Sequence, residues 1–358
     1  MKKTPLNKIH KDSGAKLVDF NGWEMPVQYT SIIKEHEAVR KKCGIFDVSH
    51  MGEIIIKGQE AFTSVQKLIT NDISQLKKGG VMYTPMCAPN GGILDDVIVY
   101  FLDEDKFMLV VNASNIDKDW EWIKNHVSNN KCDVCNQSQA FALLALQGPL
   151  SRNILDDLVD YNLKQLNKFH WIKSEIENEE ILISRTGYTG ELGYELYVSS
   201  KKAEKIWKLL INIGKQYDLV PAGLGARNTL RLEKKLCLYG NDITEDNHPL
   251  EAGLGWTVKF DKNEFIGKNA LLKIKNEGYD QVLKGFIMKD RGIPRNGYSI
   301  EVTGKTIGKV TSGSFSPTLK ENIGLGYINK NFADIGREIN IIIRNKKYKA
   351  EIVKTPFV

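Results

Sequence analysis

Apolar residues recur at helical spacing in four segments of the chain. The spacing predicts helices over residues 31–44, 114–127 and 200–216, and a further helical stretch over 267–275. Gly44 can end the first helix, while Ser114 and Ser200 can cap the starts of the next two. The buried faces of these helices carry aromatic residues such as Trp120 and Trp207, which we interpret as core residues.

Short runs rich in β-branched and apolar residues predict strands between these helices. The runs cover residues 52–58, 95–102, 107–112, 141–147 and 181–184 and are mostly bounded by turn residues. Helices and strands therefore mix irregularly along the chain. This favours an α+β fold over a doubly wound parallel sheet.

The pattern changes after about residue 277. Short strands are predicted near 282–289, 306–312, 323–328, 338–343 and 347–353, separated by glycine and proline. We expect a small β-barrel or sandwich domain from residue 277 to the end. Within it, the segment 324–327 (Gly-Leu-Gly-Tyr) is interpreted as a strand with close backbone packing.

Composition narrows the class of protein. A chain of 358 residues is too long for one ordinary core, and its 42% hydrophobic content is typical of a globular enzyme. No stretch approaches the ~20 apolar residues of a membrane span. The first residues contain no apolar secretory segment and do not resemble a transit peptide, and the five cysteines are scattered, so we expect reduced thiols and a bacterial cytoplasmic location.

The net charge of +6 raises the question of a nucleic-acid ligand. Basic and acidic residues alternate along the whole chain, and basic runs are short. An acidic protein partner explains this charge better than nucleic acid does.

The segment from Arg185 to Leu196 carries the strongest local signal. A strand runs into a turn containing Gly187, Gly190 and Gly193, and a second strand leaves it. Packing Tyr188, Tyr194 and Glu195 around this turn would place an aromatic wall beside a carboxylate, which suits an aminopyrimidine ring with adjacent N–H donors. An ordinary hairpin with exposed tyrosines remains the alternative.

Two adjacent aspartates begin the strand that follows a hairpin turn at residues 89–92. Neighbouring strand residues face opposite sides, so Asp96, and not Asp95, shares a face with Ile98 and Tyr100. A carboxylate on an apolar, aromatic face is a candidate for a shifted pKa and proton chemistry. The alternative is that both aspartates merely flank the turn.

The segment from Gly223 to Glu233 superficially resembles a dinucleotide-binding motif. Asn228 stands where the third glycine belongs and no βαβ unit surrounds it, which argues against dinucleotide binding. The helix start, with Arg227 and Arg231 on one side, could hold an anion or a polar ring oxygen, or both arginines could pair with acidic residues such as Glu233.

Cys132 and Cys135 form a lone Cys-x-x-Cys pair. There is no second pair and no companion histidine motif, and we expect no metal site. Nor does the chain contain a nucleophile-elbow sequence, so hydrolase chemistry has no support.

Taken together, ten segments resemble the aminomethyltransferase (glycine cleavage T protein) family, in order and at consistent spacing over essentially the whole chain. They are residues 19–28, 44–53, 70–72, the strand with Asp95 and Asp96, 111–115, 146–149, 185–196, 223–233, 249–256 and 309–317. One departure is Asn228, where the family's run of residues leads us to expect aspartate, which puts the local hydrogen bonding in doubt.

The resemblance implies a three-domain, clover-like α+β fold with tetrahydrofolate in a central channel. The implied domains are 1–52 with 136–225, 53–135 with 226–276, and a C-terminal β-barrel over 277–358. It also implies an enzyme that takes the one-carbon unit from the aminomethyl-loaded lipoyl arm of the H protein of the glycine cleavage system. Tetrahydrofolate becomes 5,10-methylenetetrahydrofolate, and ammonia and dihydrolipoyl H protein are released.

The resemblance also assigns roles to single residues. Asp96 matches the family's essential aspartate and Glu195 the carboxylate that grips the pterin. The other expected folate-site residues are Met51, Tyr83, Asn112, Tyr188, Arg227 and Trp256. An ionised Asp96 could orient the folate nitrogens and stabilise the iminium-like positive charge that develops as ammonia leaves.

Two related functions compete with this interpretation. One is a folate-dependent demethylase acting on a small methylated substrate. Its pterin-binding residues would resemble those of an aminomethyltransferase. The other is a non-catalytic folate-binding iron–sulfur maturation protein, but residues 234–240 (Lys-Lys-Leu-Cys-Leu-Tyr-Gly) do not match that family's Lys-Gly-Cys-Tyr-x-Gly-Gln type of segment.

Overall fold

The computed structural model describes residues 1–127 and 131–358, which divide into two compact units. The first unit contains residues 1–68, 72–84 and 97–228, and the second contains 69–71, 85–96 and 229–358. Within the described ranges, no helix combines the length and apolar character needed to cross a membrane.

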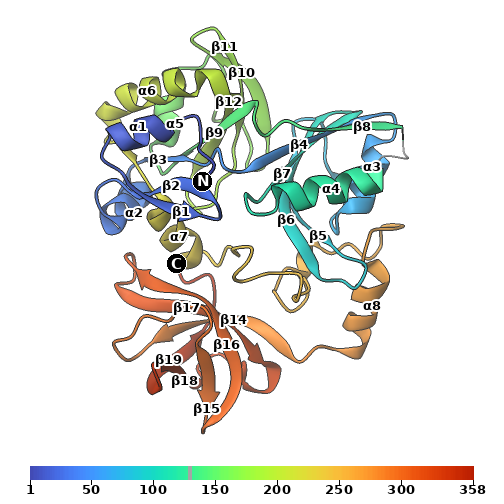
Figure 1. The fold of residues 1–358 in the computed structure, drawn as a ribbon, viewed down its shortest axis with the longest axis vertical. Helices are drawn as coiled ribbons and strands as arrows, with labels where there is room; N and C mark the ends of the chain where they lie inside the picture. The colour runs from blue at the N-terminus through green and yellow to red at the C-terminus, as the bar shows by residue number, and fades with distance from the viewer. Residues whose placement is uncertain (128–130) are drawn as a thin grey trace. The chain divides into compact units, whose positions relative to one another are not determined.

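A six-stranded sheet forms one half of the first unit (Figure 1). Its strand order is β10-β11-β12-β9-β3-β13, and only the short β13 runs parallel to its neighbour β3. Three helices, α1, α5 and α6, share a core with this sheet through Ile9, Ile154 and Ile206. The bounds are β3 Gly44–Asp47, β9 Phe141–Gln147, β10 Trp171–Ile176, β11 Glu179–Ser184, β12 Gly193–Ser199, β13 Val220–Pro221, α1 Asn7–Asp12, α5 Ser151–Asp156 and α6 Ala203–Gly214.

A hairpin of β1 (Lys16–Phe20) and β2 (Trp23–Gln28) and helix α2 (Ile32–Lys41) also belong to this half. The last helix of the unit, α7 (Leu224–Glu233), begins here, and residues after Asn228 belong to the second unit.

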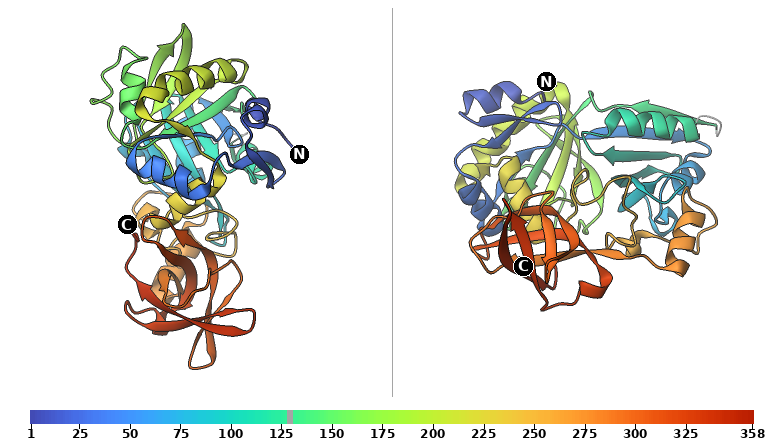
Figure 2. Two further views of the ribbon diagram at one scale, coloured as in Figure 1. Left: turned by 90° about the vertical axis from the view of Figure 1, so that its left-hand side faces the viewer. Right: turned by 60° about the horizontal axis from the view of Figure 1, so that its bottom comes forward.

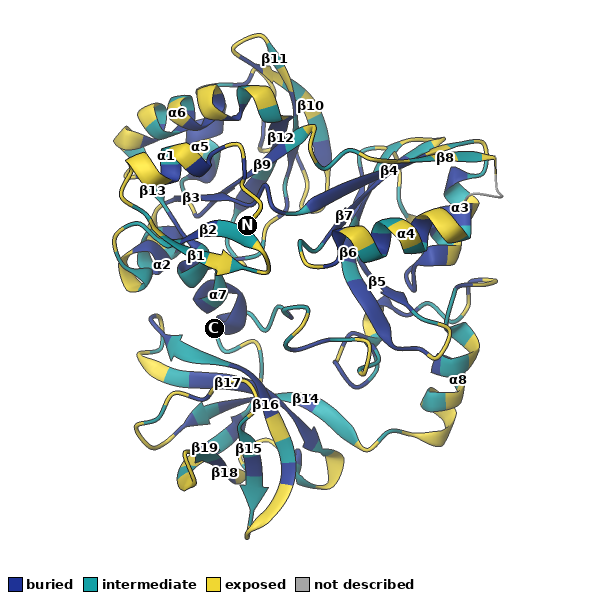
Figure 3. Ribbon diagram, viewed as in Figure 1, coloured by how far each residue is buried: buried dark blue, intermediate teal, exposed yellow. Residues whose placement is uncertain are grey.

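The second sheet has the strand order β5-β6-β7-β4-β8, and helices α3 and α4 pack on it. In α4, Ile116, Ile123 and Val127 are buried while the opposite side is exposed (Figure 3). This is the amphipathic pattern that the spacing predicts. The bounds are β4 Gly52–Gly58, β5 Val81–Cys87, β6 Ile93–Asp103, β7 Lys106–Val111, β8 Cys132–Asn136, α3 Ala61–Leu68, α4 Ile116–Val127 and the 3-10 turn η1 Ile73–Gln75.

The structure corrects three predicted helix ends. Helix α2 ends at Lys41, so Gly44 does not stop it but begins β3. Helix α4 begins at Ile116, two residues after the expected cap Ser114. Within residues 200–217, helix α6 is flanked by the 3-10 turns η2 (Ser200–Lys202) and η3 (Lys215–Tyr217). Ser200 lies in η2 and does not cap α6.

A closed six-stranded antiparallel barrel dominates the second unit, with the order β14-β17-β16-β15-β18-β19 (Figure 2). Its core contains Phe286, Ile300, Val310 and Ile341. Helix α8 (Lys268–Glu277) precedes it. The other bounds are β14 Gln281–Met288, β15 Ser299–Val302, β16 Lys305–Ser316, β17 Glu321–Asn329, β18 Glu338–Ile343, β19 Lys346–Val353 and the 3-10 turns η4 Gly255–Thr257 and η5 Lys330–Phe332.

The predicted α+β class and C-terminal barrel are confirmed. The sequence pattern missed the four-residue strand β15, which completes the barrel. Close backbone packing at β17 is also confirmed, because a Cβ atom at Gly326 would lie 2.7 Å from the backbone carbonyl oxygen of Lys309 on β16. The division of the whole chain into three domains stays a prediction.

Candidate functional site

Glu195 lies on β12, where side chains alternate between the two faces of the sheet. Tyr197 therefore shares the face of Glu195, whereas Tyr194 points to the opposite face and joins the hydrophobic core. The Tyr194 hydroxyl accepts a 3.2 Å hydrogen bond from Arg152 Nε. The expected aromatic wall thus excludes Tyr194, and Tyr197 is the tyrosine of this strand beside the carboxylate.

The turn between β11 and β12 is built around the buried amide of Gln147. Gln147 donates to the carbonyl oxygens of Thr186 and Tyr194 and accepts from the Thr189 hydroxyl. A Cβ atom at Gly187 would lie 2.0 Å from the amide oxygen, and one at Gly193 would lie 2.4 Å from the amide group. Gly187 and Gly193 therefore allow the Gln147 amide to approach the backbone closely, as the glycine spacing predicts. The hydrogen bonds of Gln147 hold the backbone on both sides of Tyr188.

Arg227 comes from the first turns of α7. It lies against Tyr188, and its charge acts on Glu195. Its guanidinium carbon lies 4.6 Å from the centre of the Tyr188 ring. The start of α7 is fixed by Glu35, whose carboxylate accepts from the backbone N–H of Gly223 at 2.9 Å. The helix start that could have held an external anion therefore already binds a carboxylate of the protein.

Two buried nitrogen atoms in this region have no hydrogen-bond partner within the described residues. They are Arg227 Nη1 and His50 Nδ1. Burial lowers the pKa of Arg227, although the charge of Glu195 opposes this. Burial and the nearby Arg227 lower the pKa of His50 to about 4, so His50 is neutral at pH 7. Unpaired buried donors and acceptors are costly, which marks them as positions for ligand contacts.

Glu195 itself is half-buried and ionisable. Burial raises its pKa, while the hydrogen bond from Thr186 and the charge of Arg227 oppose the increase. Thr186 donates to Glu195 Oε2 at 2.5 Å, and behind it lie the hydroxyls of Tyr100 and Tyr197. The first unit thus brings together Tyr188, Glu195 and Arg227 from the predicted set.

Three residues of this cluster were not expected from the sequence, namely His50, Thr186 and Tyr197. Strand alternation could have found Tyr197, which is two residues after Glu195. Glu53 was also not expected from the sequence. This residue is only 2% exposed, and burial raises the pKa of its carboxyl well above its usual range.

Met51, Tyr83 and Asn112 are also half-buried residues of the first unit. Met51 directly precedes β4 and Asn112 directly follows β7, and the two strands pair with Gly52 opposite Val111. Met51 and Asn112 therefore lie at the same end of these paired strands. Tyr83 lies on β5.

Asp96 belongs to the second unit and lies on β6, after the predicted hairpin turn. That turn is confirmed, with Ala88 N–H donating to the Gly92 carbonyl at 2.8 Å. Asp95 is fully buried and Asp96 is half-buried, as expected for adjacent residues facing opposite sides of a strand. Burial raises the pKa of the Cys237 thiol, and the charges of Asp242 and of the nearby Asp96 raise it further.

The loop over residues 236–247 supports the β6 segment that carries Asp96. Tyr239 Oη donates to the carbonyl of Ile93 at 3.2 Å, and Ile93 N–H donates to the carbonyl of Asn247 at 2.9 Å. Asp242 fixes the loop by accepting from Arg231 and from the Thr311 hydroxyl of barrel strand β16. Arg231 therefore has a structural role, and its partner is Asp242.

Trp256, the remaining residue of the predicted set, lies in η4 of the second unit. Its side chain is strongly exposed, at 62%. Such exposure is unusual for a residue with so large an apolar surface.

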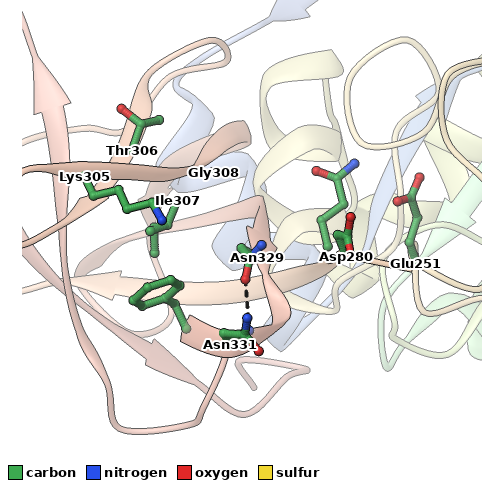
Figure 4. A pocket seen from close by; sticks show the side chains of 10 residues that line it. Glu251, Asp280, Lys305, Thr306, Ile307, Gly308, Asn329 and Asn331 are labelled. Atoms are coloured by element: carbon green, nitrogen blue, oxygen red, sulfur yellow. Dashed lines mark hydrogen bonds between the residues drawn. The ribbon is translucent and has the colours of Figure 1, made fainter. Parts of the chain in front are cut away.

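A polar cavity of about 650 Å³ in the second unit is lined by barrel residues and by residues outside the barrel strands (Figure 4). Glu251, Asp280 and Lys305 line it, together with Asn329, whose side-chain oxygen accepts from the backbone N–H of Asn331 at 3.1 Å. None of the predicted folate-site residues lines this cavity.

Cys132 and Cys135 lie three residues apart on β8, so their side chains point to opposite faces of the sheet. The Cys132 thiol lies 3.8 Å from the hydroxyl of Ser64, while Cys135 is exposed. Across the described ranges, no group of three or more His, Cys, Asp or Glu residues has a metal-binding arrangement.

Comparison with known proteins gives a consistent result over the whole chain. Residues 6–262 match the family model of the GCVT N-terminal domain, and residues 282–358 match the glycine cleavage T-protein C-terminal barrel domain. The chain is 58% identical to an aminomethyltransferase of Halothermothrix orenii, with full coverage of both chains. It is 48% identical to the aminomethyltransferase of Bacillus subtilis, covering 100% of this chain and 99% of the relative.

A solved structure agrees with these sequence matches. The crystal structure of the glycine cleavage system aminomethyltransferase T from Bartonella henselae has a TM-score of 0.94 and 34% sequence identity, covering 100% of this chain and 98% of that one. The chain therefore belongs to the aminomethyltransferase family, the T proteins of the glycine cleavage system.

Proposed function

We propose that this protein transfers the one-carbon unit of S-aminomethyl-dihydrolipoyl H protein to tetrahydrofolate. The products are 5,10-methylenetetrahydrofolate, ammonia and dihydrolipoyl H protein. The observation that carries the folate assignment is the cluster of Glu195, Arg227 and Tyr188. It combines a carboxylate, a buried unpaired N–H group and an aromatic ring.

These residues fit the chemistry of a pterin. Its N–H groups can donate to the Glu195 carboxylate, which is otherwise bonded only by Thr186 among the described residues. Its ring oxygen can accept from Arg227 Nη1, which satisfies a buried donor. Tyr188 supplies an aromatic surface and is itself held by the stacked guanidinium of Arg227.

Bound tetrahydrofolate supplies the nitrogen nucleophiles that accept the carbon unit. We assign Asp96 the role of orienting these nitrogens and stabilising the positive charge that develops on the carbon as ammonia leaves. The supporting loop over residues 236–247 holds the β6 segment in place, which suits a residue whose position must be fixed.

Met51, Tyr83, Asn112 and Trp256 complete the proposed folate site. The H protein, carrying the lipoyl arm, is the proposed protein partner, and the excess of positive charge suits an acidic one. A cytoplasmic location remains our expectation for this enzyme.

Ammonia release from aminomethyl-loaded H protein in the presence of tetrahydrofolate tests this function. We expect the parent protein to release ammonia and Asp96→Asn to lose at least ~100-fold in kcat, as expected when a charge-stabilising group is removed. Asp103→Asn is the matched control, because Asp103 is an exposed aspartate near the end of the same strand. It should keep parental activity.

Absence of ammonia release by the parent protein, or full turnover by Asp96→Asn, would contradict this assignment. The same assay with a small methylated amine in place of H protein distinguishes the demethylase alternative. Turnover of that amine at a higher kcat/KM than the H protein would favour the demethylase.

A further inference from the structure

A chain of hydroxyl groups ends on the carboxylate of Glu195. Tyr197 Oη donates to Tyr100 Oη at 2.9 Å, and Tyr100 Oη lies 3.4 Å from Thr186 Oγ1. Thr186 Oγ1 in turn donates to Glu195 Oε2 at 2.5 Å. Tyr197, Tyr100 and Thr186 are all buried, although they come from β12, β6 and the turn after β11.

The number of hydrogens available for donation determines which hydroxyl donates and which accepts in this series. Each hydroxyl has one hydrogen to donate, and an ionised carboxylate can only accept. When Glu195 is ionised, Thr186 must use its hydrogen on Glu195. Its oxygen can then only accept, from Tyr100 Oη at 3.4 Å or from Ser184 Oγ at 3.0 Å. Tyr100 in turn accepts from Tyr197. Donors that polarise one another in this way strengthen the last hydrogen bond of the series.

Among the interactions that lower the pKa of Glu195, the hydrogen bond from Thr186 is the largest, and it opposes the increase caused by burial. Burial raises the pKa of Glu195, and the Thr186 hydrogen bond lowers it more than the charge of Arg227 does. Other ionisable groups around the cluster are His50, which is neutral at pH 7, the buried Glu53, and Tyr100 and Tyr197, whose pKa values burial raises. Thr186 is thus the principal uncharged group that favours the ionised form.

We propose that Thr186, supported by Tyr100 and Tyr197, is a positioning residue that holds Glu195 ionised and fixes Oε2, leaving Oε1 to bind the ligand. Within the described residues, Thr186 makes the only hydrogen bond to this carboxylate. Without it, Glu195 would be free to rotate and to take up a proton. The proposal rests on the assignment of Glu195 as the carboxylate that binds the pterin.

Thr186→Val tests the proposal, because valine keeps the shape of threonine but has no hydroxyl. Thr186→Ser, which keeps the hydroxyl, is the matched control, and Tyr197→Phe removes only the far end of the chain. The pKa of Glu195 is measured without folate by 13C NMR of protein labelled at the glutamate carboxyl carbons, with Glu195→Gln identifying the resonance.

We expect Thr186→Val to raise the pKa of Glu195 by about one to two units, as the loss of a hydrogen bond to a charged group implies. Tyr197→Phe should raise it less, and Thr186→Ser should leave it unchanged. In turnover assays at pH 7, Thr186→Val should raise the KM for tetrahydrofolate about tenfold or more with a smaller change in kcat. The difference in KM from the parent should shrink as the pH rises.

An unchanged pKa of Glu195 in Thr186→Val, or equal shifts in Thr186→Val and Thr186→Ser, would overturn the proposal. Failure of the pterin assignment gives a different result. In that case Glu195→Gln binds tetrahydrofolate like the parent in calorimetry, whatever the pKa measurement shows.

Discussion

Arg231 and Asp242 form an ion pair that is sealed from solvent, with 2.5 Å between Arg231 Nη1 and Asp242 Oδ2. Their side chains are 2% and 0% exposed. Arg231 Nη2 also donates to the hydroxyl of Ser312 on β16, and Asp242 accepts from Leu238 N–H. The pair therefore links α7, the loop over residues 236–247 and the barrel within the second unit.

Breaking this pair should destabilise the protein strongly. Arg231→Met leaves the Asp242 carboxylate buried without its cation, which costs about 3–5 kcal/mol of unfolding free energy. Urea unfolding followed by tryptophan fluorescence measures the loss. Lys173→Ala, which removes one member of an exposed ion pair with Glu180, is the control and should unfold like the parent. Equal midpoints for Arg231→Met and the parent would contradict a structural role.

Glu53 should make the protein less stable as the pH rises. Its carboxyl is buried, which raises its pKa in the folded state well above the 4.5 of an unperturbed glutamate. Between those two pKa values, the folded form holds a proton that the unfolded form has lost. This one group therefore lowers the unfolding free energy by about 1.4 kcal/mol per pH unit.

Glu53→Gln removes that dependence. We expect the variant to gain stability relative to the parent as the pH rises from 5 towards 8, and to lose the gain near pH 4. Urea unfolding at each pH measures the difference. A constant difference between the variant and the parent over this range would show that Glu53 titrates normally.

A side chain at position 187 should conflict with Gln147. Because the Gln147 amide is fully buried and bonded on both sides, it cannot move away from a Cβ atom that would lie 2.0 Å from its oxygen. Gly187→Ala should cost about 1–3 kcal/mol of unfolding free energy, as overpacking does. Combining it with Gln147→Ala should cost less than the sum of the single changes, and strict additivity would rule out the conflict.

Replacing Arg227 should weaken tetrahydrofolate binding without lowering the stability of the unliganded protein. Its unpaired, buried N–H group is costly in the unliganded protein, so Arg227→Met should leave the melting temperature unchanged or raise it. The same change removes a charge-assisted hydrogen bond to the pterin, worth about 1.5–3 kcal/mol, or roughly 10- to 150-fold in Kd. Calorimetric titration with tetrahydrofolate and differential scanning calorimetry measure the two effects. Lower stability with unaltered affinity would assign Arg227 to the scaffold instead.

The sequence was sufficient to predict the α+β class, the barrel and the glycine-rich turn. These features depend on local signals, namely the two-residue alternation of strands and the spacing of glycine and proline. Helix ends were less accurate. Gly44 was expected to end α2, but backbone pairing with β9 and β13 makes it the first residue of a strand.

The residues that contact the candidate-site residues could not be predicted, because they are distant in the sequence. Tyr100 was expected only as a neighbour of Asp96 on one strand face, yet its hydroxyl meets those of Thr186, from the turn after β11, and Tyr197, from β12. Pairing with an acid such as Glu233 was one of two roles left open for Arg231, and tertiary packing gives it Asp242 from the following loop. Glu233 instead accepts from the hydroxyls of Ser316 and Thr318.

The discontinuous makeup of the second unit has a consequence for synthesis on the ribosome. Residues 85–96, which include Asp96 and the buried Cys87, pack with residues 229–358, which are translated only after residues 97–228. At about 5–20 residues per second, synthesis of the intervening residues 97–228 takes roughly 7 to 26 seconds before the packing partners of this segment are made. Nascent chains stalled before residue 229 should therefore leave Cys87 open to alkylation, whereas the released, complete chain should protect it.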